Sequence, residues 1–157
     1  MATNPSAAAA AAGEQELVIT CVFDAPRDLV FKAWTEPERA ARWWGPQGFA
    51  LVACEADVRP GGAWRRCLRA PDGTELWKRG VYREIVEPER LVFTYADEDA
   101  SGNPGRETLV TVIFADICGK TRLTLHQVGF ASRRSCDLHR AGWASCLDRL
   151  AEHLIKN

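Results

Sequence analysis

Few residues in this chain have the types and spacing that catalysis requires. Its histidines are His126, His139 and His153. The motifs of serine hydrolases, zinc proteases and phosphate-binding glycine loops do not occur in the sequence. The cysteines and histidines lack the spacing of a zinc site, so no metal or cofactor is predicted. We expect His139 and His153 to face solvent, whereas His126, on a strand, could point outward or toward an interior cavity.

Arg66 is the most informative charged residue. In a strand over 62–70, alternation places Trp64, Arg66 and Leu68 on one face. Because that strand should bury Trp64, it carries Arg66 inward as well. A buried arginine is costly unless it is paired, so Arg66 is predicted to contact an anion or to form half of an internal salt bridge.

Tryptophan is unusually common, with six residues against six phenylalanines and two tyrosines. We expect Trp64 and Trp143 to face the interior and Trp44 to lie at a cavity entrance. On a strand over 90–97, Phe93 and Tyr95 share a face that Trp143 should approach. These side chains form either a dry aromatic core or the wall of a pocket.

The six cysteines do not form a disulfide or metal motif. None of them has C-x-x-C spacing, and a chain of 157 residues does not need disulfide crosslinks. We therefore predict buried structural thiols, which behave as small hydrophobic side chains. The cysteines are Cys21, Cys54, Cys67, Cys118, Cys136 and Cys146.

The elements that must position these residues follow from hydrophobic periodicity and turn signals. A strand is predicted over 17–23, then two short helices with Asp24 and Thr35 as N-caps. A long terminal helix is predicted with Ser135 as its N-cap and an apolar stripe that includes Trp143 and Leu147. Between them, six further strands are predicted near 49–58, 62–70, 75–86, 90–97, 106–116 and 120–128.

This order of elements predicts an α+β fold of one domain over residues 15–157, preceded by a disordered, alanine-rich tail over 1–14. Short turns make successive strands antiparallel neighbours. The terminal helix must bury its stripe on the sheet, and a sheet that curves around one helix often leaves a cavity between them.

Charge and hydropathy narrow the class of protein. A net charge of -1 argues against nucleic-acid binding through bulk electrostatics. No apolar run approaches the ~20 residues that span a bilayer. The alanine run near the start lacks the basic segment of a secretory signal. We therefore expect a soluble, cytoplasmic protein that does not insert into membranes.

The chain resembles the START-like superfamily, also called SRPBCC or birch-pollen-allergen-like, which has the helix-grip fold. Within it, the sequence is most similar to activators of heat-shock-protein-90 ATPase. The resemblance covers residues 17–155 in the expected order. It is carried by Ala25–Pro37, Trp43–Pro46, Asp57–Gly62, Pro71–Gly73, Gly80–Tyr82, Pro88–Thr94, Thr121–Leu125 and Gly142–Trp143 with Leu147 and Leu150.

The resemblance implies a curved antiparallel sheet of about seven strands wrapped around the long terminal helix, in the order β-α-α-β6-α, but it does not fix one chemistry. The leading hypothesis is binding of a small hydrophobic or lipid-like molecule between sheet and helix. The candidate ligand-binding residues are Trp44, Trp64, Arg66, Tyr82, Phe93, Tyr95, His126, Trp143 and Leu147.

Two other functions stay open at this point. One is a co-chaperone-like contact with a heat-shock ATPase, which rests on the family alone. The other is an enzyme of the cyclase or dehydratase kind, with Arg66, Tyr82, Tyr95 or His126 assisting proton transfer. Because no base stands in an evident dyad, the sequence favours binding over catalysis.

Overall fold

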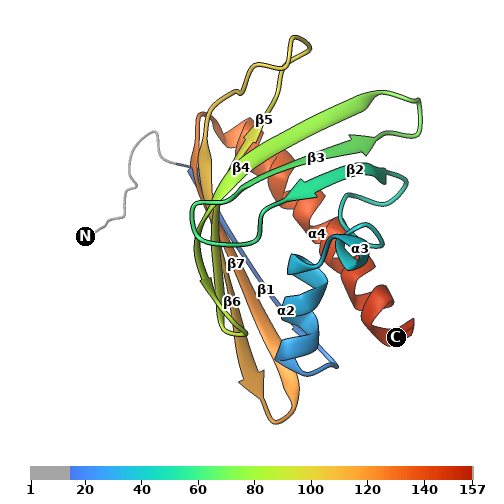
Figure 1. Ribbon diagram of the computed structural model, residues 1–157, viewed down its shortest axis with the longest axis vertical. Coiled ribbons are helices and arrows are strands. Elements are labelled where there is room, and N and C mark those ends of the chain that lie inside the picture. Colours follow the sequence, from blue (N-terminus) through green and yellow to red (C-terminus); the bar gives the residue numbers. More distant parts are fainter. Residues whose placement is uncertain (1–14, 157) are drawn as a thin grey trace.

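A computed structural model describes residues 15–156 of the chain, and the alanine-rich segment over 1–14 lies outside the described residues. Seven antiparallel strands form one open, curved sheet in the order β1-β7-β6-β5-β4-β3-β2 (Figure 1). The strands are β1 (Gln15–Phe23), β2 (Ala50–Ala56), β3 (Ala63–Arg69), β4 (Glu75–Val86), β5 (Arg90–Asp97), β6 (Thr108–Ile117) and β7 (Lys120–Phe130).

Three helices complete the fold of residues 15–156. The short helices α2 (Arg27–Thr35) and α3 (Pro37–Ala40) follow β1, and α4 (Arg133–Lys156) ends the chain. Figure 1 shows α4 running diagonally across the concave side of the sheet, with α2 and α3 beside its C-terminal half. The predicted α+β helix-grip arrangement is confirmed, and each predicted strand is found within two residues or so of its expected bounds.

The predicted helix caps are wrong in detail. Helix α2 has Pro26 at its N-cap and helix α3 has Glu36, and neither N-cap makes a side-chain hydrogen bond. The Thr35 hydroxyl instead donates to the carbonyl of Phe31 at 3.1 Å, one turn back in its own helix. At α4, Ser132 rather than Ser135 is the capping residue, since its hydroxyl oxygen accepts the Ser135 N–H at 3.1 Å.

Register places the predicted face of β3 inward. Arg66 lies opposite Lys78 on β4, and Trp64 lies opposite Gly80. A Cβ at position 80 would lie 2.5 Å from Trp64 Nε1 and 1.9 Å from the Thr94 carbonyl oxygen. Glycine therefore lets the Trp64 indole cross β4 and donate to that oxygen at 3.2 Å. Trp64 and Arg66 are 4% and 5% exposed.

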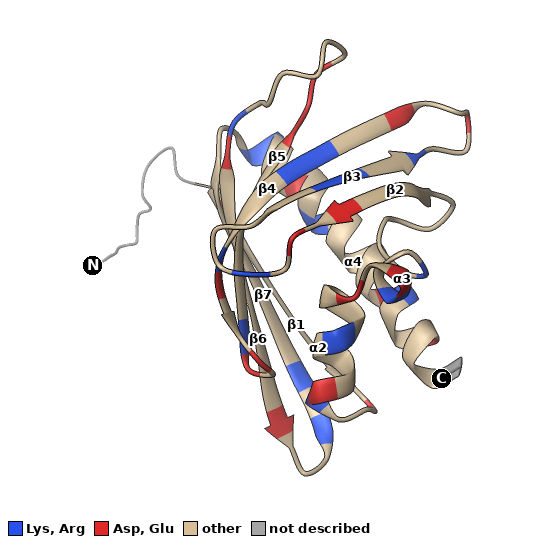
Figure 2. Cartoon of the chain, viewed as in Figure 1, with Lys and Arg blue, Asp and Glu red and all other residues tan. Residues whose placement is uncertain are grey.

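Charged residues of both signs lie on the same elements. Figure 2 shows basic and acidic residues interspersed along the strands and loops, and their totals are nearly equal, at 20 and 21. All six thiols are free. The prediction that the thiols are buried is wrong for three of them. Cys118 is exposed in the turn between β6 and β7, and Cys21 and Cys54 are half-buried. None of the described helices is long and apolar enough to cross a membrane.

Candidate functional site

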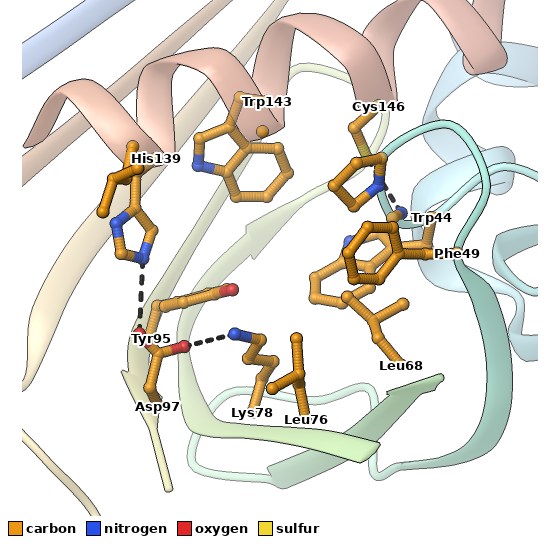
Figure 3. A pocket seen from close by; sticks show the side chains of 14 residues that line it. Trp44, Phe49, Leu68, Leu76, Lys78, Tyr95, Asp97, His139, Trp143 and Cys146 are labelled. Carbon is orange, nitrogen blue, oxygen red and sulfur yellow. Dashed lines mark hydrogen bonds and ion pairs between the residues drawn. The ribbon is translucent and has the colours of Figure 1, made fainter. Parts of the chain in front are cut away.

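A cavity of about 400 Å³ lies between α4 and the strands β3, β4 and β5. This volume is within the range of small-molecule sites, and the lining is mostly apolar (Figure 3). Helix α4 forms one wall and the loop before β2 forms another. The lining residues are Trp44, Gly45, Pro46, Phe49, Leu68, Leu76, Lys78, Tyr95, Asp97, Leu138, His139, Gly142, Trp143 and Cys146.

Three ionisable side chains form one polar edge of the cavity. The Lys78 ammonium lies 2.6 Å from one Asp97 carboxylate oxygen, and His139 Nε2 lies 3.5 Å from the other. Burial tends to raise the pKa of Asp97, but the hydrogen bond from His139 and the charge of Lys78 outweigh it and hold that pKa at about 2. Asp97 is therefore ionised at neutral pH.

His139 is fixed in place from both sides. Its Nδ1 lies 2.9 Å from the Ser135 carbonyl oxygen, while Nε2 faces Asp97. Its ring packs against Phe130 and Tyr95, with centroids at 5.0 and 5.7 Å. The expectation that His139 faces solvent is wrong, because the N-terminal part of α4 lies close enough to the sheet to cover it.

The loop wall of the cavity is tied to α4 by polar contacts. The Arg149 guanidinium donates to the carbonyl oxygens of Gly45 at 3.0 Å, Pro46 at 3.2 Å and Phe49 at 3.1 Å. The Gly45 N–H approaches Cys146 Sγ at 3.1 Å. Burial raises the pKa of the Cys146 thiol to about 12, so the thiol is neutral at the cavity wall. These contacts hold the wall in a defined position.

Another, much smaller void of about 10 Å³ has Arg66 among the residues that line it. Arg66 Cζ lies 4.9 Å from the Trp44 ring and 5.6 Å from the Trp64 ring, so the cation stacks against two indoles. Arg66 was predicted to contact an anion or to form half of an internal salt bridge. Among the described residues, no carboxylate forms an ion pair with it. Trp44 lines both spaces.

The predicted site residues therefore divide into three groups. Trp44, Tyr95 and Trp143 line the large cavity, and the Tyr95 hydroxyl points toward its middle (Figure 3). The small void is lined by Trp44 again and by Trp64, Arg66, Tyr82 and Phe93.

Two predicted residues lie outside both spaces. His126 belongs to the opposite face of β7, where its side chain is 41% exposed and bonds to the Glu16 carboxylate at 2.6 Å. The alternation that buries Leu125 and Gln127 turns His126 outward. Leu147 packs in the hydrophobic core. A further correction concerns His153, which was expected at the surface and is 8% exposed.

The sequence does not predict the polar edge. Asp97 ends a predicted strand and Lys78 lies within another, and neither residue belongs to a motif that marks it as functional. His139 could have been found, because it precedes Trp143 by four residues and therefore shares its helix face. Asp97 and Lys78 meet only through the pairing of β4 with β5, where they are register partners.

Comparison with solved structures places this geometry in a recurring fold. The AHSA1 protein from Silicibacter pomeroyi is 25% identical, with a TM-score of 0.82 over 90% of this chain and 98% of that one. A protein from Chromobacterium violaceum is 26% identical, with a TM-score of 0.79 over 88% and 96%. One from Rhizobium leguminosarum is 27% identical, with a TM-score of 0.75 over 92% and 96%.

Sequence comparison agrees with the structural likeness. No curated protein sequence matches the chain. The family model described as activator of Hsp90 ATPase homolog 1-like protein matches residues 24–154, well over half of the chain and all elements from α2 to α4. The chain belongs to the activator of Hsp90 ATPase homolog 1-like family.

Proposed function

We propose that this protein binds a small, mostly apolar molecule in the cavity between α4 and the sheet. The observation that carries the proposal is the cavity itself, with about 400 Å³ of space and a wall of aromatic and aliphatic side chains. Binding is favourable in free energy when an apolar ligand displaces water from such a surface.

The polar edge is held in a fixed position. His139 Nδ1 lies beside the Ser135 carbonyl oxygen and Nε2 lies beside an Asp97 carboxylate oxygen, so protein groups surround both ring nitrogens. Asp97 is held ionised by Lys78 and His139. The three side chains provide fixed hydrogen-bonding groups that orient a ligand along one side of an apolar space.

A co-chaperone role, which the family description raises, has no comparable support in the described surface. In the view of Figure 2, basic and acidic residues are mixed along the strands and loops. The exposed large apolar side chains include Val22 on β1 and Leu138 and Ile155 near opposite ends of α4. We therefore base the proposed function on the cavity.

Titration with the uncharged fluorescent probe N-phenyl-1-naphthylamine tests the proposal, together with native mass spectrometry for a co-purified molecule. The decisive variant is Gly142→Leu. A Cβ at Gly142 would meet only Pro46 Cγ, at 4.0 Å, so the added side chain enters the cavity mouth without a clash at its base. Replacing a helical glycine also favours the helix.

The matched control is Ala141→Leu, which adds the same side chain one residue earlier, at an exposed position of α4. We expect the wild type and Ala141→Leu to bind the probe with equal affinity, and Gly142→Leu to bind it at least about tenfold more weakly while unfolding at the same or a higher temperature. Equal binding by all three proteins, or no binding by the wild type, would exclude this cavity as the site.

A further inference from the structure

Three hydrogen-bond donors around the small void have no acceptor. Trp34 Nε1, Trp44 Nε1 and Arg66 Nε are fully buried and unbonded. All three residues line the same void of about 10 Å³. Buried polar groups in proteins are nearly always hydrogen-bonded, so three orphaned donors around one space call for an explanation.

The rest of the aromatic core shows that the fold can satisfy its indoles. Three other buried tryptophans donate to good acceptors, at 2.9, 3.2 and 2.7 Å. Their acceptors are the Ala33 carbonyl for Trp43, the Thr94 carbonyl for Trp64 and the Gln127 side chain for Trp143. The missing acceptors are therefore confined to the surroundings of Arg66.

The chemistry of the void favours an anion over water. A water molecule would bring two hydrogens that need acceptors of their own. Apart from the three donors and Trp64, whose N–H is already used, the void is lined by apolar side chains and Tyr82. An anionic oxygen only accepts hydrogen bonds, and it also neutralises the guanidinium, which is permanently charged and lacks a carboxylate partner.

The position of the void connects it to the ligand cavity. Trp44 lines both spaces, so the void and the cavity are neighbours. The charge of Arg66 is also felt in the cavity, since burial raises the pKa of both Tyr95 and Cys146 and the positive charge of Arg66 opposes each rise. A void of about 10 Å³ has room for one atom the size of an oxygen.

We propose that Trp34, Trp44 and Arg66 form the head-group subsite for a monocarboxylate whose apolar body fills the large cavity. This inference rests on the proposed function and specifies its ligand class. One carboxylate oxygen occupies the void and accepts from the three donors, while the rest of the molecule extends past Trp44 between α4 and β4. A free halide has the same acceptor chemistry, and the test separates the two sources.

Calorimetric titration with decanoate and 1-decanol at pH 7.5 tests the subsite, because the two probes share a chain length and differ in the anionic head. We expect the wild type to bind decanoate roughly tenfold or more tightly than decanol, a ratio typical of charge-assisted hydrogen bonds. In Arg66→Met the ratio falls to about one. Trp34→Phe, which removes one N–H from a residue outside the large cavity, lowers the ratio as well.

Two further variants locate the charge that matters. Arg83→Met removes a cation whose side chain is 58% exposed on β4, and it should keep the wild-type ratio. Lys78→Met removes the cation at the polar edge. If the preference for decanoate survives in Arg66→Met and disappears in Lys78→Met, the head group binds at the edge and the subsite is wrong. Circular dichroism confirms folding, and Trp34→Phe decides the matter if Arg66→Met does not fold.

Failure of this inference differs from failure of the proposed function. Equal affinity of the wild type for decanoate and decanol overturns the carboxylate subsite but leaves an apolar binding cavity. Absence of binding by decanoate, decanol and the naphthylamine probe overturns both. Crystals soaked in sodium bromide test the other source of an anion. An anomalous peak in the void, without any preference for decanoate, would assign the donors to a free halide and contradict the proposal.

Discussion

Replacing Arg66 with methionine is expected to stabilise the unliganded protein. The guanidinium is charged and 5% exposed, and its Nε has no hydrogen-bond partner. An unsatisfied buried donor costs about 1–3 kcal/mol, and an unpaired buried charge adds a desolvation penalty. Methionine has a similar length, fills the same space and has no polar hydrogen to satisfy.

The aromatic contacts offset part of this cost. Arg66 Cζ lies 4.9 and 5.6 Å from two indole rings, and a desolvated cation–π contact is worth about 2 kcal/mol. The balance leaves a net gain of about 1–3 kcal/mol for Arg66→Met, in line with the effect of replacing buried charges by apolar side chains. For a domain of this size the gain is a rise of roughly 3–10 °C in the unfolding midpoint.

Urea unfolding at pH 7.5 without added ligand, followed by circular dichroism, measures this gain. Arg83→Met is the matched control, and at an exposed site it should change stability by less than about 0.5 kcal/mol. Arg65→Met provides the opposite case on the same strand. Arg65 donates to both carboxylate oxygens of Glu98, at 2.8 and 2.9 Å, and the Glu98 side chain is 1% exposed, so losing Arg65 should destabilise the protein. A loss of about 1 kcal/mol or more in Arg66→Met would refute the reasoning.

Two further predictions concern the cavity wall. The pKa of Asp97 is about 2 in the folded protein and 3.8 in its reference state, so its contribution to stability is present above about pH 4 and is lost as the pH falls through 2. The urea midpoint of Asp97→Asn should therefore change less between pH 5 and pH 2 than that of the wild type. An equal change in the two proteins would contradict this prediction. Burial raises the pKa of the Cys146 thiol to about 12, whereas Cys118 is exposed. Iodoacetamide at pH 8 should therefore modify Cys118 and spare Cys146, as measured by intact-mass and peptide mass spectrometry. Comparable rates at the two thiols would show that Cys146 is not buried in the cavity wall.

The inward position of Arg66 could be predicted from alternation because β3 runs without a bulge from Ala63 to Arg69. The same rule was available for His126. The buried residues of β7 alternate through Leu123, Leu125 and Gln127, which leaves His126 on the outer face. The sequence alone leaves both orientations open, because a polar Gln127 gives no sign that it is buried. Its burial depends on hydrogen bonds with Thr108 and Trp143, from β6 and α4, which no local pattern shows.

The partner of Arg66 could not be predicted for a related reason. Alternation says that a residue points inward, but its neighbours depend on register between distant segments. Arg66 is the register partner of Lys78, which pairs in turn with Asp97. A carboxylate thus lies on the same face of the sheet, yet it bonds to Lys78 and His139 instead of Arg66. Only the three-dimensional arrangement shows that the buried cation lacks a protein anion.

The unsatisfied polar groups of this core lie together in one place. A tightly packed aromatic interior gains from dispersion and burial, and it loses when a polar atom lacks a partner. Here most indoles are satisfied, while the unsatisfied donors gather around one arginine beside the ligand cavity. A core selected for stability alone would replace that arginine with an apolar side chain. The arginine is an advantage if an anionic ligand pairs with its charge and accepts from the unsatisfied donors on binding. On this argument, the higher stability of Arg66→Met and its loss of preference for decanoate both follow from removing the same unpaired charge.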